Sequence, residues 1–382
     1  MYHARSKQGS KGTSSPRASV LRMLGIFVCG CFPLQAADLP SVGGFAQFDT
    51  QYGQLDGSPY QATTGMRRIR TDFKGKVGRF DYHINLDHGS GSSAMVDAYL
   101  SFDPTSDLNV RLGKAKSPMG FEILQAPTDL VFPEYGITYG FLPNRDTGVF
   151  LTYRGSAWQV VGAYLAGSPD GASLSKNTDT SGALVGRATS VLGDLQLSLG
   201  GSVETRANGL ASSGLLPSYA ISGGSTFFSY DEDSYAEGLF YRVVPNMVWK
   251  EGAFGSMSEG VVSSGFVRNG ANRARLTHYA WQMTWYWNLF GETTDIYGRN
   301  DFDHDVWQWG VRFGGARMDG ASFPLFADVD QTESLFVLGT ALNWYWGHEA
   351  KWSLGVDEVM HTAANGNVSR ETIATGRLQL MF

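Results

Sequence analysis

The sequence has no long apolar run and almost no cysteine. No stretch of about 20 consecutive apolar residues occurs, which excludes a membrane protein built from helices. Both cysteines, Cys29 and Cys31, lie near the N-terminus, so the rest of the chain can form neither disulfides nor thiolate metal sites. No Gly-x-Ser-x-Gly motif occurs and the seven histidines are scattered. We therefore predict no catalytic residues, no metal site and no cofactor.

The first 36 residues read as a secretory signal peptide. The segment contains no acidic residue and carries five basic ones before its apolar part: Arg5, Lys7, Lys11, Arg17 and Arg22. An apolar stretch from Met23 to Phe32 and a small residue at Ala36 complete the pattern of a signal peptide with its cleavage site. The alternative is a disordered basic tail. The predicted organisation is a signal peptide over 1–36 and one domain over 37–382.

Glycine and aromatic residues are abundant in this chain, and charged residues are scarce. The chain has 48 glycines, 23 phenylalanines, 17 tyrosines and 10 tryptophans, against 17% charged residues. Glycines that bend strands and aromatic residues that form interfacial girdles are typical of membrane β-barrels. The net charge of −6 gives no reason to expect a nucleic-acid partner.

From Gly43 onward, apolar and polar residues alternate with a period of two. The clearest example is the segment 279–289, where Tyr279, Trp281 and Trp285 alternate with Gln282 and Thr284. A face this aromatic opposite a polar face predicts strands between lipid and water. A β-sandwich core is the alternative, but it would not need about sixteen such strands.

The connections between these strands alternate between short and long, as in outer-membrane barrels. Longer loops are expected near 115–145, 206–234 and 268–276, among others, and the connection near 290–304 is long where a turn is due. The prediction is an all-β fold: a transmembrane antiparallel β-barrel of about 16 strands.

The last strand supports a closed barrel. Leu378, Leu380 and Phe382 share one face, while Arg377 and Gln379 share the other. Such a strand would be an exposed edge in a soluble protein, but in a barrel it pairs with the first strand. It also resembles the C-terminus of bacterial outer-membrane barrels, which implies that barrel-assembly machinery binds it through Phe382.

The order of motifs in the first half resembles the phosphate-selective porin O/P family. The matching segments are Gly65 to Gly75, Phe80 to Asp87, Val110 to Pro118 and Arg145 to Val149, with Leu342 to Tyr345 near the end. The resemblance implies a homotrimer of sixteen-stranded channels in the Gram-negative outer membrane, in contact with its lipid. It also implies a third outer loop folded into each barrel.

The resemblance further implies that Arg67 and Arg68, which match a double arginine of the family, contribute to an anion site. Phosphate-specific members also carry a ladder of arginines in the fifth loop. Here that loop has no basic residue between Arg206 and Phe228, which puts phosphate specificity in doubt.

The alternation of apolar and polar residues predicts which other basic residues of this region face the lumen. Ile69 and Phe73 would face lipid, so Arg68, Arg70 and Lys74 would face the lumen. An arginine facing lipid at the bilayer midplane would cost about 2–4 kcal/mol, which supports this assignment. Arg67 lies at the loop end of the strand and can turn inward. Basic residues that bracket the third loop would extend the strip: Lys114, Lys116 and Arg145.

Two arrangements of these charges remain open. The arginines either form a strip that attracts anions, or pair with luminal acids and merely hold the wall; the candidate partners are Asp72, Asp81, Asp87 and Asp97. Acids in or beside the third loop would oppose the strip: Glu122, Asp129, Glu134 and Asp146.

We therefore predict a porin and not an enzyme. It would admit small hydrophilic solutes by passive diffusion, with a bias toward small inorganic or organic anions such as phosphate. The alternatives are a general or cation-leaning porin without phosphate specificity or, from other classes, a barrel-borne enzyme or an adhesion barrel.

Overall fold

The computed structural model describes residues 39–56, 58, 60–89, 93–166, 182–210, 216–289 and 305–382, with the side chains of 206–210 excepted. The predicted signal peptide, 1–36, lies outside these residues. Within the described ranges, no helix is long and apolar enough to cross a membrane.

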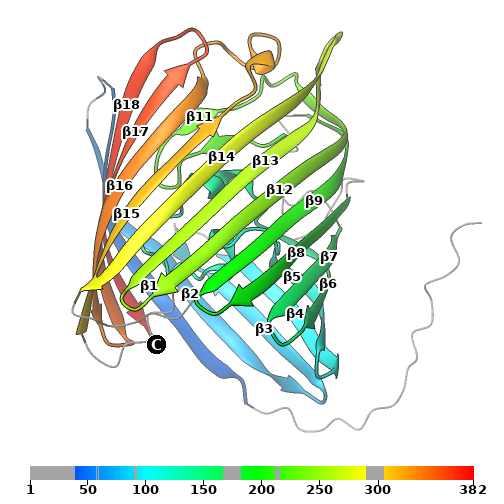
Figure 1. The fold of residues 1–382 in the computed structure, drawn as a ribbon, viewed down its shortest axis with the longest axis vertical. Coiled ribbons are helices and arrows are strands. Elements are labelled where there is room, and N and C mark those ends of the chain that lie inside the picture. The colour runs from blue at the N-terminus through cyan, green and yellow to red at the C-terminus, as the bar shows by residue number, and fades with distance from the viewer. Residues whose placement is uncertain are drawn as a thin grey trace, which may run out of the picture. The chain divides into compact units, whose positions relative to one another are not determined.

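Sixteen strands form one closed antiparallel barrel, as predicted (Figure 1). Every strand is hydrogen-bonded to its neighbours in the chain, except that β9 pairs with β12 and β1 with β18. The strands are β1 (Ser41–Leu55), β2 (Gln61–Val77), β3 (Phe80–Asp87), β4 (Ala94–Thr105), β5 (Leu108–Lys116), β6 (Arg145–Arg154), β7 (Trp158–Leu165), β8 (Gly182–Leu192), β9 (Leu195–Leu210), β12 (Tyr235–Glu251), β13 (Phe254–Asn269), β14 (Asn272–Leu289), β15 (Asp305–Arg317), β16 (Thr332–Trp346), β17 (Ala350–Ala363) and β18 (Val368–Met381).

The last strand closes the barrel against the first. Their register runs from Phe45 opposite Met381 to Leu55 opposite Glu371. Because every strand has two partners, no edge is left with unpaired backbone groups.

The alternation seen in the sequence separates the two faces of the wall. In β14, Tyr279 and Trp281 are 49% and 47% exposed on the outer face, while Gln282 and Asn288 are buried inside. The interior is not uniformly polar, however. Leu276 and Ala280 of the same strand also face inward and are buried.

Short turns lie at one end of the barrel and most of the longer loops at the other, which is the upper end in Figure 1. The prediction of a longer loop near 268–276 is wrong. There β13 and β14 continue until Asn269 pairs with Asn272, and only two residues make the turn. Gly270 has a φ of 57°, a conformation that a hairpin turn of this length requires and that glycine adopts without strain. The predicted long connection at 290–304 lies outside the described residues.

The third outer loop, residues 117–144 (loop 3), folds into the barrel as predicted. It contains two short 3-10 helices, η2 (Glu122–Leu124) and η3 (Ile137–Phe141), and most of its residues are buried. Its partners include β13, β14 and β15, far from it in sequence.

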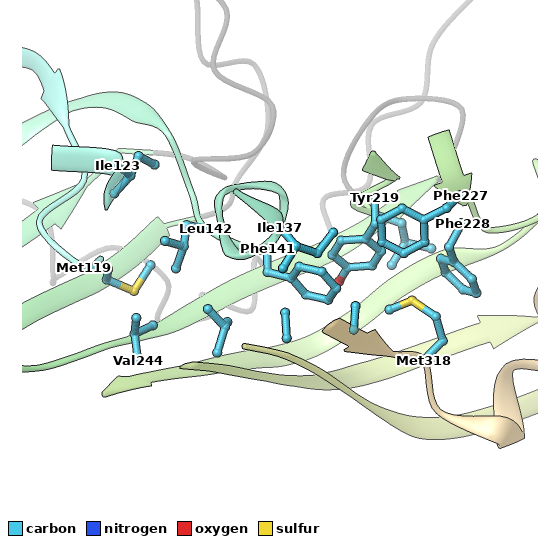
Figure 2. Packing of buried hydrophobic residues seen from close by; sticks show 14 of the residues in the cluster. Met119, Ile123, Ile137, Phe141, Leu142, Tyr219, Phe227, Phe228, Val244 and Met318 are labelled. Atoms are coloured by element: carbon cyan, nitrogen blue, oxygen red, sulfur yellow. The ribbon is translucent and has the colours of Figure 1, made fainter. Parts of the chain in front are cut away.

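The fifth outer loop, residues 211–234 (loop 5), also folds inward over its described part, which the sequence did not predict. A small hairpin of β10 (Tyr219–Ala220) and β11 (Thr226–Phe228) places Tyr219 against Phe141 of loop 3, with ring centroids 4.2 Å apart. Figure 2 shows these rings within an apolar cluster that continues to Val244 on β12 and to Met318 beyond β15. Met318 begins the seventh outer loop, residues 318–331 (loop 7), which holds the 3-10 helix η6 (Gly320–Ser322). The cluster fixes loop 3 against one side of the interior.

Candidate functional site

Loop 3 is fastened by donors that project from the barrel wall to its backbone carbonyls. A loop inside a barrel carries carbonyl groups that no strand can satisfy, and each would be costly if left unpaired. The wall supplies the partners: Lys116 Nζ to Gln125 O at 2.6 Å, Lys351 Nζ to Leu130 O at 2.6 Å, Asn343 Nδ2 to Val131 O at 2.8 Å, Arg312 Nη1 to Glu134 O at 3.0 Å and Arg242 Nε to Phe141 O at 2.9 Å. Four basic side chains and one amide thus hold the loop through its carbonyl groups.

A β-bulge in β2 brings both Arg67 and Arg68 to the luminal side. Gln47 of β1 pairs with Arg68, but the next residue, Phe48, pairs with Met66, so Arg67 has no opposite residue. An extra residue in one strand shifts the alternation locally, which allows two consecutive side chains to point inward. Met66, before the bulge, is exposed on the outer face.

Three guanidinium groups converge on the Glu134 carboxylate of loop 3. Arg67 Nε lies 2.9 Å from Oε1, Arg377 Nη2 lies 2.5 Å from the same oxygen, and Arg68 Nη2 lies 3.5 Å from Oε2. The Ser222 hydroxyl of loop 5 donates to Oε2 at 2.9 Å. Arg377 also binds Asp49 through two bonds of 2.7 and 2.6 Å. Two carboxylates therefore face three guanidiniums. We call these five ionic side chains the arginine cluster.

The electrostatics of the cluster keep Glu134 ionised. Burial alone would raise its pKa, but the positive charges of Arg68, Arg377 and Arg67 outweigh burial and hold the pKa far below its usual range. An anionic group is thus stable at this point of the lumen. Arg67 is the most accessible of the three arginines, with 37% of its side chain exposed.

The other predicted basic residues form a second group. Arg70 Nε lies 2.9 Å from Asp87 Oδ2, and Arg145 Nε lies 2.9 Å from Asp97 Oδ1. Lys116 is within electrostatic range of Arg70 and Arg145. These pairs match the arrangement in which arginines pair with luminal acids and hold the wall, one of the two that the sequence left open.

Lys114 and Lys74 lie at the margins of this group. Lys114 is near Arg145 and its neighbour Asp146. Lys74 is exposed and pairs with His83 in the register of β2 and β3, toward the short-turn end. The structure thus brings Arg67 and Arg68 together in one cluster and Arg70, Lys116 and Arg145 in another, and it leaves Lys74 apart from both.

Two wall acids have other partners than the sequence suggested. Asp72 accepts from Asn85 at 2.7 Å and lies 2.5 Å from His83 Nε2, and Asp81 forms an exposed pair with Lys76 at 3.4 Å. In the part of the chain that the structure describes, neither of these two carboxylates contacts a predicted arginine.

Sequence reasoning missed three arginines and a lysine that hold loop 3: Arg242, Arg312, Arg377 and Lys351. Each occupies an inward position on a strand in the second half of the chain. The signal was available for Arg377, which alternation places on the polar face of the last strand. What the sequence does not show is that the loop reaches these positions, 178 residues away in the case of Glu134 and Arg312.

No cluster of three or more histidine, cysteine, aspartate or glutamate residues suited to a metal ion occurs within the part of the chain that the structure describes. The conspicuous chemistry of the lumen is that of guanidinium, ammonium and carboxylate groups.

A closed barrel of sixteen antiparallel strands, with an outer loop folded inward against a charged wall, is the architecture of an outer-membrane porin. The family model "Phosphate-selective porin O and P" matches residues 42–382. The chain belongs to this family: it is a porin of the Gram-negative outer membrane, a non-enzymatic diffusion channel of an anion-selective class.

Solved structures share this fold at low sequence identity. The outer-membrane channel DcaP of Acinetobacter baumannii is 14% identical, with a TM-score of 0.61 over 91% of this chain and 97% of its own. OmpF of Salmonella typhi is 9% identical, with a TM-score of 0.55 over 89% and 97%. OmpT of Vibrio cholerae in its trimer form is 9% identical, with a TM-score of 0.54 over 90% and 100%. No curated protein matches the sequence.

Proposed function

We propose that small anions cross this channel along the basic side of the lumen, where the arginine cluster and the Arg70–Lys116–Arg145 group face loop 3. The observation that carries the proposal is the convergence of Arg67, Arg68 and Arg377 on Glu134. Guanidinium groups bind carboxylates and phosphates through parallel hydrogen bonds, so the groups that hold Glu134 also suit a solute anion.

The internal carboxylate makes binding weak. Glu134 already occupies the position that a solute's anionic group would take, so an entering anion shares or displaces an existing partner. One positive charge of the cluster remains uncompensated, since Glu134 and Asp49 face three arginines. A channel needs attraction that is weak enough to allow exit, and partial neutralisation supplies this.

Lys114, Lys116 and Arg145 extend the path in this proposal. Lys116 donates to the carbonyl oxygen of Gln125 and so holds loop 3 beside this path. Lys74 has a minor role, because it is exposed and lies apart from both groups. Phosphate binds only weakly, because the fifth loop lacks an arginine ladder.

A trimer is the proposed assembly. A protein of the same fold, OmpT of Vibrio cholerae, was solved in a trimer form, which supports this proposal. We also infer that residues 1–36 direct export and that barrel-assembly machinery reads the last strand through Phe382. Cross-linking in native membranes tests the trimer, and N-terminal sequencing of the mature protein tests the cleavage site.

A planar bilayer experiment tests the selectivity. In a potassium chloride gradient, the reversal potential should show a modest preference for chloride, and phosphate should reduce chloride current only at millimolar concentration. Half-block at micromolar phosphate would contradict the weak site.

One observation favours a cation-leaning or general porin as the second candidate. Arg70 and Arg145 are each neutralised by a wall acid, and loop 3 adds the half-buried Asp129 to the lumen. A reversal potential of cationic sign would select this candidate over the first.

A further inference from the structure

Four arginines face outward near the ends of β13, β14 and β15. Arg268 is opposite Arg273, Phe266 is opposite Arg275, and Arg317 is opposite Tyr279. All lie on the same face as the exposed Tyr279 and alternate with buried residues such as Val267, Leu276 and Ala316. They are therefore on the outer surface of the barrel and not in the lumen. We call Arg268, Arg273, Arg275 and Arg317 the outer arginine patch.

The patch lies at the extracellular border of the lipid-facing surface. The turn between β13 and β14 lies at the same end as loops 3, 5 and 7, which is the outer end of a porin (Figure 1). Toward the membrane the same face continues with Tyr279, Trp281 and Val262, all exposed. Aromatic residues of this kind mark the boundary between the acyl chains and the head groups.

Aromatic rings and a shared carboxylate hold the guanidiniums in place. The Arg273 guanidinium carbon lies 4.1 Å from the ring centroid of Phe266. Arg273 and Arg268 both bind Glu237, with Nε to Oε2 distances of 2.8 and 3.3 Å. One carboxylate thus orients two arginines and neutralises only one of them.

The other two arginines add further unbalanced charge. Arg275 Nε donates to Ser264 Oγ at 3.0 Å, and its guanidinium carbon lies 5.7 Å from the ring of Tyr241. Within the described part of the chain, no carboxylate contacts Arg275. Arg317 is 3.7 Å from Glu333, and 73% of its side chain is exposed. The patch therefore carries a net positive charge and free donors on a surface that borders lipid.

We propose that the outer arginine patch binds the phosphorylated head group of an outer-leaflet lipid. Phosphate matches the fork of guanidinium donors, and the apolar surface directly below the patch matches acyl chains attached to that head group. Arginine side chains at a membrane border also extend toward the head groups while their stems cover apolar surface. The charge and the continuity with the lipid-facing wall favour a lipid over a free anion or a protein.

The test uses the mature barrel purified in detergent, with diphosphorylated lipid A as the probe. Protein and lipid are mixed, separated by size exclusion and assayed for protein-bound lipid, alongside dephosphorylated lipid A. The test variant is Arg273→Gln with Arg275→Gln. The matched control is Arg79→Gln, because Arg79 is also exposed and lies over two rings, Phe80 and Phe102, but at the opposite end of the barrel.

We expect the double variant to bind the phosphorylated lipid at least about tenfold more weakly, since each arginine near a charged membrane surface contributes about fivefold. The control should bind like the wild type, and the dephosphorylated lipid should not distinguish the proteins. Arg273→Lys with Arg275→Lys should retain most binding, which separates charge from fold. Heat-modifiable gel migration verifies that each variant is folded.

Three results would overturn the proposal. The first is equal lipid retention by the wild type and the double variant, or an equal loss in the Arg79→Gln control. The second is complete displacement of the lipid by inorganic phosphate, which would indicate a site for the free anion. The third is a change of oligomeric state in the double variant, which would make the patch a contact between copies of this chain.

Discussion

The two sides of the lumen hold loop 3 by different means. On the side of β12 and β13, the loop packs through apolar residues such as Phe141 and Met119. The charged residues that bond to it there, Arg242 and Glu259, are deeply buried. On the side of β1, β2 and β18, it is held by the arginine cluster around Glu134. Apolar packing positions the loop but offers nothing to a solute. Ionic contacts can exchange one anion for another, so the same bonds can fasten the loop and attract a solute.

Removal of Arg242 from its buried pair with Glu204 should cause the largest loss of stability. Each side chain is only 1% exposed, and Arg242 also donates to loop 3. Because Arg242→Ala leaves a buried carboxylate without this partner, we expect the free energy of unfolding to fall by about 3–5 kcal/mol. Urea unfolding in detergent, followed by tryptophan fluorescence, measures this.

The opposite side supplies the matched comparison. Arg70 and Asp87 are 10% and 18% exposed, against 1% for each member of the Arg242–Glu204 pair, so Arg70→Ala should cost less, about 1–3 kcal/mol. The double variant Arg242→Ala with Glu204→Ala should be more stable than Arg242→Ala alone. If Arg242→Ala and Arg70→Ala lower the free energy of unfolding by similar amounts, the two sides of the lumen do not differ in how strongly their ion pairs stabilise the barrel.

The pH dependence of loop 3 should come from Glu122, which burial gives a pKa of about 7. Arg312 opposes this shift and Glu259 reinforces it, while Gln282 and the backbone of Gly136 bond to the carboxyl group. A released loop would have the ordinary pKa of 4.5. Between pH 4.5 and about 7, the Glu122 carboxyl group keeps its proton in the docked loop and loses it in the released loop. Docking therefore weakens as the pH rises through this range.

The expected loss over this window is on the order of 3 kcal/mol, from 1.36 kcal/mol per pKa unit. Hydrogen exchange of loop 3 amides, corrected for the intrinsic pH dependence of exchange, should show falling protection up to about pH 7 and little change above it. Glu122→Gln should abolish this trend. A trend that survives in Glu122→Gln would assign the titration to another group.

Glu134→Gln should release the arginines from their internal anion. We expect selectivity to move toward anions and phosphate to block at about tenfold lower concentration, which corresponds to about 1.4 kcal/mol. Single-channel recording with phosphate titration measures both. Glu358→Gln makes the same charge change on the outer face, where Glu358 is exposed and accepts from Thr372. If both variants behave alike, Glu134 does not restrain the arginines.

Alternation predicted the barrel because each strand satisfies the same local rule. It placed Tyr279 outside and Arg68 inside correctly, since lipid and lumen impose opposite costs on the two residue types. It failed for the turn at Gly270, because strands can extend beyond the membrane and nothing in the local pattern marks their ends. The inward fold of loop 5 was also missed, since Tyr219 and Phe227 reveal their role only against Phe141 of loop 3.

The site was predictable only in part for a related reason. Arg67, Arg68 and Arg70 follow one another on a strand, so their proximity is local. Arg377 is 243 residues from Glu134, and their contact depends on barrel closure together with the path of loop 3. The bulge at Arg67 likewise depends on the register with β1, which the sequence of β2 alone does not contain.

The smallest expected effect separates an anion strip from simple wall pairs. Arg68 and Arg70 share one strand face and are two residues apart, about 6.6–6.8 Å along the strand. Their potentials overlap within the Debye length of about 8 Å at physiological salt. Arg68→Gln with Arg70→Gln should therefore move the reversal potential toward cations, and more than Lys74→Gln does, because Lys74 is exposed and lies apart from loop 3. Raising the salt concentration should reduce the shift in both variants, since mobile ions screen the potential of luminal charges. If the double variant assembles normally and its selectivity at low salt equals that of the wild type, Arg68 and Arg70 serve only to hold Glu134 and Asp87. The attraction for anions would then have to come from Lys114, Lys116 and Arg145, where the same recording can be repeated with one charge removed at a time.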